Sequence, residues 1–106
     1  MLHRSIQEFV SYCRLADFSQ RSLQAMVCRL NEFTAFLKSQ RIRSIKKITY
    51  LDLVAFAADF NKPSIHVRKS RVWTLRQFYH FLTLNHKVAK NIARRLAYPK
   101  IEISVP

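Results

Sequence analysis

Residues 20–40 repeat apolar side chains at the spacing of an α-helix, and this stripe constrains the fold more than any other feature of the chain. Its members fall within about a third of the helical wheel, and they are Leu23, Met26, Val27, Leu30, Phe33, Thr34 and Leu37. A stripe of this kind predicts a helix with one buried face. Less regular stripes of the same period predict further helices at residues 2–17, 50–60 and 64–84.

Residues that favour helix starts stand at the beginning of three of these segments. Ser19 is suited to cap the helix at residues 20–40, and Ser64 is suited to cap the last long helix. Thr49 and Asp52 have the spacing of a capping box, in which each side chain accepts a hydrogen bond from the other residue's backbone.

A short fifth helix is expected at residues 92–97, with Asn91 as its cap and Pro99 beyond its end. The chain contains no glycine. Glycine-rich phosphate loops, dinucleotide-binding fingerprints and Asn-Gly hairpins are therefore excluded. The predicted fold class is all-α, with four long helices and a short fifth helix.

Positive charge dominates the chain and is uneven along it. The 106 residues include 19 Lys and Arg against six Asp and Glu, a net charge of +13. Residues 1–60 hold nine basic and five acidic residues (+4), whereas residues 61–106 hold ten basic and one acidic residue (+9). An excess concentrated on particular helices favours a nucleic-acid partner over an ordinary solvated surface. No apolar run approaches the ~20 residues that span a bilayer, so no membrane partner is expected.

The residue pattern does not point to catalysis or to metal binding. Cys13 and Cys28 lack CxxC spacing and are expected to be free thiols, with no disulfide implied, and the four histidines form no metal-ligand pattern. The acidic residues are isolated, and no Ser/His/Asp or Cys/His arrangement is present. We therefore expect no catalytic residue, metal, cofactor or small-molecule substrate.

Two helical faces are candidates for binding. The side of residues 20–40 opposite the stripe carries small, polar and basic residues: Arg21, Gln24, Ala25, Cys28, Arg29 and Glu32. Taken alone, this side is an ordinary solvated face. The outward side of residues 64–84 carries His66, Lys69, Ser70, Trp73 and Gln77, flanked by Arg68 and Arg71. Such side chains suit contacts with phosphates and base edges. Trp73 is interpreted as packing against the fifth helix, with stacking on a partner as the alternative.

Several segments occur in the order of a known family. They are FSQRSLQAMVCRLNEFTAFL (18–37), KITYLDLVAF (47–56), RVWTLRQFYHFL (71–82) and a closing stretch with Asn91, Leu96 and Pro99-Lys100. In this order they resemble the N-terminal core-binding, SAM-like domain of tyrosine recombinases, which include phage integrases and Xer-type proteins. The resemblance covers nearly the whole chain. Family members often have proline after the asparagine, whereas Ile92 follows Asn91 here, which leaves the start of the fifth helix less rigid.

The resemblance implies a compact orthogonal bundle over residues 1–97, and it implies that residues 98–106 begin a linker to a C-terminal catalytic domain outside this chain. In the family, the core-binding domain covers one face of double-stranded DNA through its second and fourth helices, and the catalytic residues belong to the other domain. The resemblance also implies contacts with other recombinase protomers on the DNA and a location in the prokaryotic cytoplasm, at the nucleoid.

Particular positions of this chain match the family's DNA-facing positions. They are Ser22, Gln24, Ala25 and Cys28 on the second helix and His66, Ser70 and Arg71 on the fourth. Three outward basic residues complete the expected DNA-binding set: Arg21, Arg68 and Lys69. Charge reversal at Lys69 or Arg71 is expected to weaken DNA binding without unfolding the domain, since neither residue lies on the apolar stripe.

Two other functions share some of these features. A helical protein-interaction module would be favoured by an exposed apolar patch of Phe36, Trp73 and Phe81, which lie off the main stripes. RNA binding shares the positive charge, but the chain lacks the aromatic strand platform of common RNA-binding modules.

Overall fold

The computed structural model describes residues 2–100, in which four α-helices follow one another. They are α1 (Leu2–Leu15), α2 (Gln20–Ser39), α3 (Tyr50–Asp59) and α4 (Ile65–Leu84), and a 3-10 turn at Ile45–Lys47 precedes α3. Residues 2–100 contain no strand. The four long helices and the all-α class expected from the sequence are confirmed, with small differences at the helix ends.

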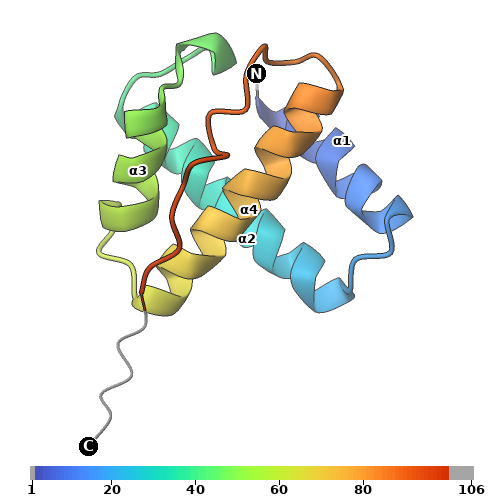
Figure 1. Ribbon diagram of the computed structural model, residues 1–106, viewed down its shortest axis with the longest axis horizontal. Helices are drawn as coiled ribbons and strands as arrows, with labels where there is room; N and C mark the ends of the chain where they lie inside the picture. The colour runs from blue at the N-terminus through green and yellow to red at the C-terminus, as the bar shows by residue number, and fades with distance from the viewer. Residues whose placement is uncertain (1, 101–106) are drawn as a thin grey trace, which may run out of the picture.

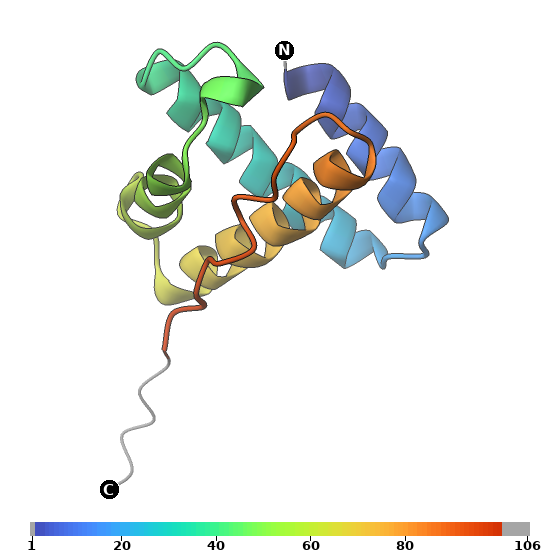
Figure 2. The same ribbon diagram turned by 45° about the horizontal axis from the view of Figure 1, so that its top comes forward.

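α2 and α4 form the centre of the molecule, with α1 and α3 on opposite sides of them (Figure 1). α4 packs against all three other helices, and α1 also packs on α2. Figures 1 and 2 both place the first turns of α2 and α4 on the same side of the molecule. The two helices cross, so α4 begins toward α3 and α2 begins toward α1 along that side (Figures 1 and 2).

The core is filled by the apolar stripes of all four helices. The largest fully buried side chains include Phe9 of α1, Phe33 of α2, Phe56 of α3 and Phe78 of α4. Their rings contact one another, with centroids 5.3 Å apart for Phe9 and Phe78 and 5.1 Å apart for Phe33 and Phe56. These aromatic contacts connect the helices into one core.

The apolar surface patch of Phe36, Trp73 and Phe81 that would favour an interaction module does not form. Phe36 and Phe81 are each only 5 % exposed. A central helix is covered from more than one side, so residues beside the main stripe are buried as well. Phe36 packs on Phe56 of α3, and Phe81 packs on Phe9 of α1.

The predicted caps fix three helix starts. Ser19 and Ser64 each accept a hydrogen bond at Oγ from the backbone N–H three residues later. Thr49 and Asp52 form the reciprocal capping box, with distances of 2.8 Å from Thr49 N to the carboxylate and 3.2 Å from Asp52 N to the hydroxyl. Each cap satisfies a backbone N–H that has no partner inside the helix.

The helices end without glycine. Five residues that follow helices have positive φ angles between 48° and 64°: Asp17, Arg41, Asn61, Lys62 and His86. A left-handed conformation costs a residue with a Cβ roughly 1–2 kcal/mol, and asparagine and aspartate tolerate it best. Arg41 and Lys62 are therefore strained positions in the backbone.

The expected fifth helix at residues 92–97 is wrong. Asn91 does act as a cap, since its Oδ1 accepts a hydrogen bond from Ala93 N at 3.1 Å. The bonds that follow span only three residues, from Arg94 N to Asn91 O and from Leu96 N to Ala93 O, so the segment forms turns. Ala93 and Leu96 are buried in the core, which holds a segment too short to sustain a helix by itself.

The segment at residues 91–99 runs beside α4 (Figures 1 and 2). Arg76 of α4 donates from Nη1 to the backbone oxygen of Leu96 at 3.3 Å, and its guanidinium lies 5.7 Å from the centre of the Tyr98 ring. Of the expected linker at residues 98–106, only residues 98–100 are described, and residues 101–106 lie outside the described residues.

Candidate nucleic-acid interface

α2 and α4 carry a large excess of positive charge. Their seven basic residues are Arg21, Arg29, Lys38, Arg68, Lys69, Arg71 and Arg76. Glu32 is the single acidic residue on the two helices, so together they carry seven minus one, or +6. α3 has two acidic residues and no basic residue. The central helix pair is therefore strongly cationic, whereas α3 is acidic.

The structure leaves most of the expected DNA-binding residues accessible. Five of them are exposed: Arg21, Gln24 and Cys28 on α2, and His66 and Lys69 on α4. Four are half-buried: Ser22, Ala25, Arg68 and Ser70. Because the first turns of α2 and α4 lie on one side of the molecule, the basic residues at these two helix starts share that side.

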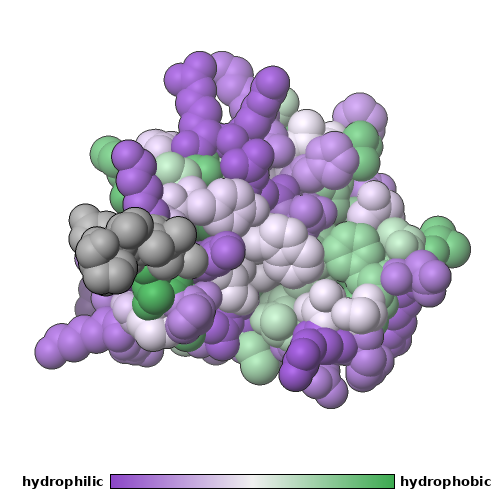
Figure 3. Space-filling model, turned by 60° about the horizontal axis from the view of Figure 1, so that its bottom comes forward, coloured by the Kyte–Doolittle hydropathy of each residue, from purple (hydrophilic) through white to green (hydrophobic). Residues whose placement is uncertain are grey.

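Figure 3 views the molecule from the end at which α2 and α4 begin. Long hydrophilic side chains project around the rim of this face, and the middle of the face is weakly polar to apolar. The free backbone N–H groups at two helix starts add partial positive charge to the same end.

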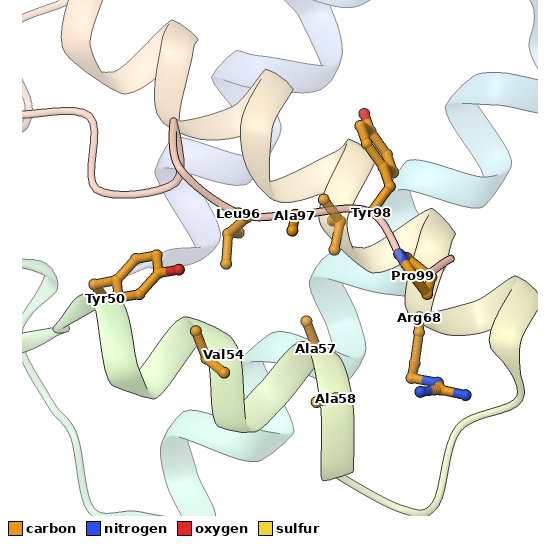
Figure 4. Close-up of a pocket in the computed structure, with 10 residues that line it drawn as sticks. Tyr50, Val54, Ala57, Ala58, Arg68, Leu96, Ala97, Tyr98 and Pro99 are labelled. Atoms are coloured by element: carbon orange, nitrogen blue, oxygen red, sulfur yellow. The ribbon is translucent and has the colours of Figure 1, made fainter. Parts of the chain in front are cut away.

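Arg68 is only partly available to a partner. It is the one charged residue among those that line an apolar groove of about 300 Å³ between α3 and the segment Leu96–Pro99 (Figure 4). Its Nε is buried and has no hydrogen-bond partner in the part of the chain that the structure describes. The groove is walled by alanine, valine, leucine and proline side chains together with two tyrosines, so it offers little polar recognition.

Arg71 is buried, and the expectation that it faces outward is wrong. Its side chain is 2 % exposed. Its Nε donates to Glu32 Oε1 at 3.1 Å, and its Nη1 donates to the backbone oxygens of Phe56 and Phe60 at 2.9 and 2.8 Å. The guanidinium also lies 4.5 Å from the centre of the Phe56 ring. Arg71 precedes Leu75 by one helical turn, so it shares the buried face of α4. It connects α2, α3 and α4.

Glu32 binds a second arginine through the same oxygen. Arg29 Nε lies 3.2 Å from Glu32 Oε1 and forms an ion pair with it. This Nε is buried and makes no hydrogen bond among residues 2–100. The side chain of Arg29 is 19 % exposed and that of Glu32 is 31 % exposed. The sequence placed both residues on the outward side of α2, yet it gave no reason to select Arg29 for binding.

Trp73 packs on the protein, but its partner differs from the expected one. It is half-buried against the core, and its ring centre lies 6.2 Å from that of Phe18. Phe18 belongs to the connection between α1 and α2. The contact therefore attaches the start of α2 to the outward side of α4.

Both thiols are free, and they lie in different environments. Cys13 is buried and Cys28 is exposed. Burial raises the pKa of the Cys13 thiol to about 11, which makes it unreactive at neutral pH. Within the described residues, no group of three or more His, Cys, Asp or Glu side chains could hold a metal ion. None of the helices in residues 2–100 combines the length and the apolar character needed to cross a bilayer.

Comparisons with known proteins identify the family of the chain. The family model described as "Phage integrase, N-terminal SAM-like domain" matches residues 6–86. The chain is 26 % identical over 104 residues to tyrosine recombinase XerC of Bacillus subtilis, which covers 95 % of this chain and 34 % of that protein. It is 24 % identical over 101 residues to XerC of Anoxybacillus flavithermus, covering 92 % of this chain and 34 % of that protein. The chain thus spans about a third of the length of these relatives. No solved structure matches significantly.

Proposed function

Because the chain belongs to the family of phage integrase N-terminal SAM-like domains, we propose that it is the non-catalytic DNA-binding domain of a tyrosine recombinase. It binds the core site of duplex DNA through α2 and α4 and positions the recombinase for integration or recombination. Since the chain aligns with a third of its relatives, strand cleavage and joining depend on residues outside this alignment. The protein acts on DNA in the bacterial cytoplasm, together with other protomers.

The observation that carries this proposal is the charge of +6 on α2 and α4, two helices that begin on the same side of the molecule. Duplex DNA carries one negative charge per ~1.7 Å of its axis. A face with long hydrophilic side chains at its rim and a less polar middle (Figure 3) suits a groove that is flanked by two charged backbones.

Individual residues take different roles in this proposal. Arg21 and Lys69 are exposed cations near the helix starts and contact phosphates. Gln24 is exposed on α2 and can pair with an adenine edge. His66 and Cys28 line the same exposed faces, and Ser22, Ser70 and Arg68 contribute from half-buried positions. Arg71 is excluded from the contact set because its guanidinium is buried.

Salt titration of duplex binding tests the proposal. If roughly six phosphates are neutralised, the logarithm of the binding constant should fall against the logarithm of salt concentration with a slope of about −5 to −6. The isolated domain should bind weakly, because a recombinase also holds DNA through other parts. Absence of duplex binding at low salt would reject the proposal. Equal binding to duplex RNA would indicate that the protein binds nucleic-acid duplexes in general and not DNA in particular.

A second candidate function is contact with another protomer or a partner protein. The outer side of α3 favours it, because Leu51 is 73 % exposed and Tyr50 and Val54 are exposed next to it. Sedimentation distinguishes the two functions. A stable dimer in the absence of DNA would favour the interaction module, whereas a monomer that binds duplex DNA would favour the DNA-binding domain.

A further inference from the structure

We propose that Arg29 forms a phosphate-binding site where α2 packs on α4, and that Glu32 and Arg71 hold it in place. The inference rests on the proposed DNA binding. It adds a contact with the DNA backbone at a residue that lies outside the expected DNA-binding set. It also gives buried Arg71 a positioning role.

The charges at this site do not balance. Arg29 and Arg71 both approach Glu32 Oε1, at 3.2 and 3.1 Å, so two guanidinium groups share one carboxylate. Arg71 makes the better pair, because it donates a hydrogen bond to Glu32 and is also surrounded by the carbonyls of Phe56 and Phe60 near the end of α3. The C-terminal end of a helix carries partial negative charge and stabilises a cation. Among residues 2–100, Arg29 has no such additional partner, so its charge is the less compensated of the two.

Arg29 is held against the protein. Its side chain is only 19 % exposed, and its Nε is buried without a hydrogen bond among the described residues. A guanidinium has five N–H donors in a fixed plane, and it recognises phosphate through pairs of parallel hydrogen bonds. A partly desolvated cation attracts an anion more strongly than a fully solvated one. Holding the group beforehand also lowers the entropic cost of binding.

The position of Arg29 on α2 places it beside the proposed DNA contacts. Ser22, Ala25 and Arg29 are separated by three and four residues, so they form one line along the helix. α4, the helix paired with α2, has no acidic residue. An acidic protein segment and a phosphodiester would both satisfy one guanidinium, but a polyanion fits the whole basic surface of the two helices better.

The test compares Arg29→Gln with a matched control, Arg4→Gln. Arg4 also pairs with a glutamate on its own helix, Glu8, at 3.4 Å, but it lies on α1 and is 89 % exposed. Both variants remove one positive charge, so the net charge of the protein changes equally in both. Titration of a duplex of about three helical turns (~30 base pairs) should show that Arg29→Gln lowers affinity on the order of tenfold and reduces the salt slope by about one. Arg4→Gln should change both quantities much less. Equal effects of the two variants would overturn the proposal.

A measurement on the unmodified protein covers the case in which Arg29→Gln fails to fold. Addition of the same duplex should move the NMR signal of the Arg29 Nε–Hε group and leave that of Arg4 in place. If backbone signals of α2 shift while the Arg29 side-chain signal stays unchanged, the phosphate site is refuted and DNA binding stands. If the unmodified protein does not bind the duplex at low salt, the proposed function itself fails.

Discussion

Replacing Arg71 by methionine should strongly destabilise the fold. Methionine fills a similar volume but supplies none of the hydrogen bonds that Arg71 donates to Glu32, Phe56 O and Phe60 O. The two carbonyls lose a charged donor, and Glu32 loses its closest cation. α2 and α3 would then lose a polar connection to α4 that no neighbouring side chain replaces.

The size of the effect follows from the burial of the pair. Breaking a buried ion pair by removing one partner costs about 3–5 kcal/mol. Glu32 is 31 % exposed, so water recovers part of its solvation, and we expect the lower end, about 3 kcal/mol. For a domain of about 100 residues, each kcal/mol lowers the melting temperature by about 4–8 °C. The melting temperature should therefore fall by about 12–24 °C. A loss of about 3 kcal/mol is a large part of a total stability of about 5–15 kcal/mol.

Urea denaturation followed by circular dichroism measures this change. Arg71→Met should lower the urea midpoint without changing the slope of the transition. Arg4→Met provides the control, since its ion pair with Glu8 is exposed and such pairs contribute little. If both variants have the same urea midpoint and Arg71→Met loses only DNA binding, then Arg71 is a DNA contact and the buried network has no structural role.

Three further predictions concern other parts of the molecule. Lys69→Glu should weaken duplex binding and lower the salt slope while the melting temperature stays within a few degrees, because Lys69 is exposed; a collapse of the fold would show that α4 is oriented differently. Arg41→Gly should raise the free energy of unfolding by up to about 1 kcal/mol, since Arg41 has a φ of 57° and the gain exceeds the flexibility that glycine adds to the unfolded chain; an unchanged urea midpoint would count against strain there. The free energy of unfolding should fall from about pH 8.5, where an unfolded thiol ionises, toward pH 11, because the folded state keeps the Cys13 proton up to about pH 11 and the unfolded state does not. Cys13→Ala should make this fall in the urea midpoint less steep. An equally steep fall in the variant would exclude Cys13 as its cause.

The features of the fold that depend on neighbouring residues could be predicted from the sequence. The caps at Ser19, Thr49 and Ser64 need only residues within the next helical turn, and all three form. The stripe at residues 20–40 likewise identified most of the residues that α2 buries, although it missed Phe36. The fifth helix failed because local signals at Asn91 and Pro99 compete with the burial of Ala93 and Leu96, which is a property of the packed core.

The arginine network could not be predicted, because its partners are distant in sequence. Glu32 lies 39 residues from Arg71, and the carbonyl of Phe56 lies 15 residues away. A helical wheel places cations outward by default and does not register an acceptor supplied by another helix. For the same reason the wheel placed Arg71 at the flank of the outward side of α4, whereas the structure buries it. The wheel gave Arg29 no role of its own, whereas the structure leaves its charge under-compensated.

NMR mapping of a duplex titration tests the central claim most directly. If α2 and α4 form the binding surface, the backbone amide shifts should concentrate at residues 19–29 and 64–77 and should decrease as salt is added. The NMR signals of amides on the outer side of α3 and on the N-terminal half of α1 should not shift. Shifts concentrated on α3 or α1, with those of α2 and α4 unchanged, would contradict the claim that the basic helix pair binds DNA.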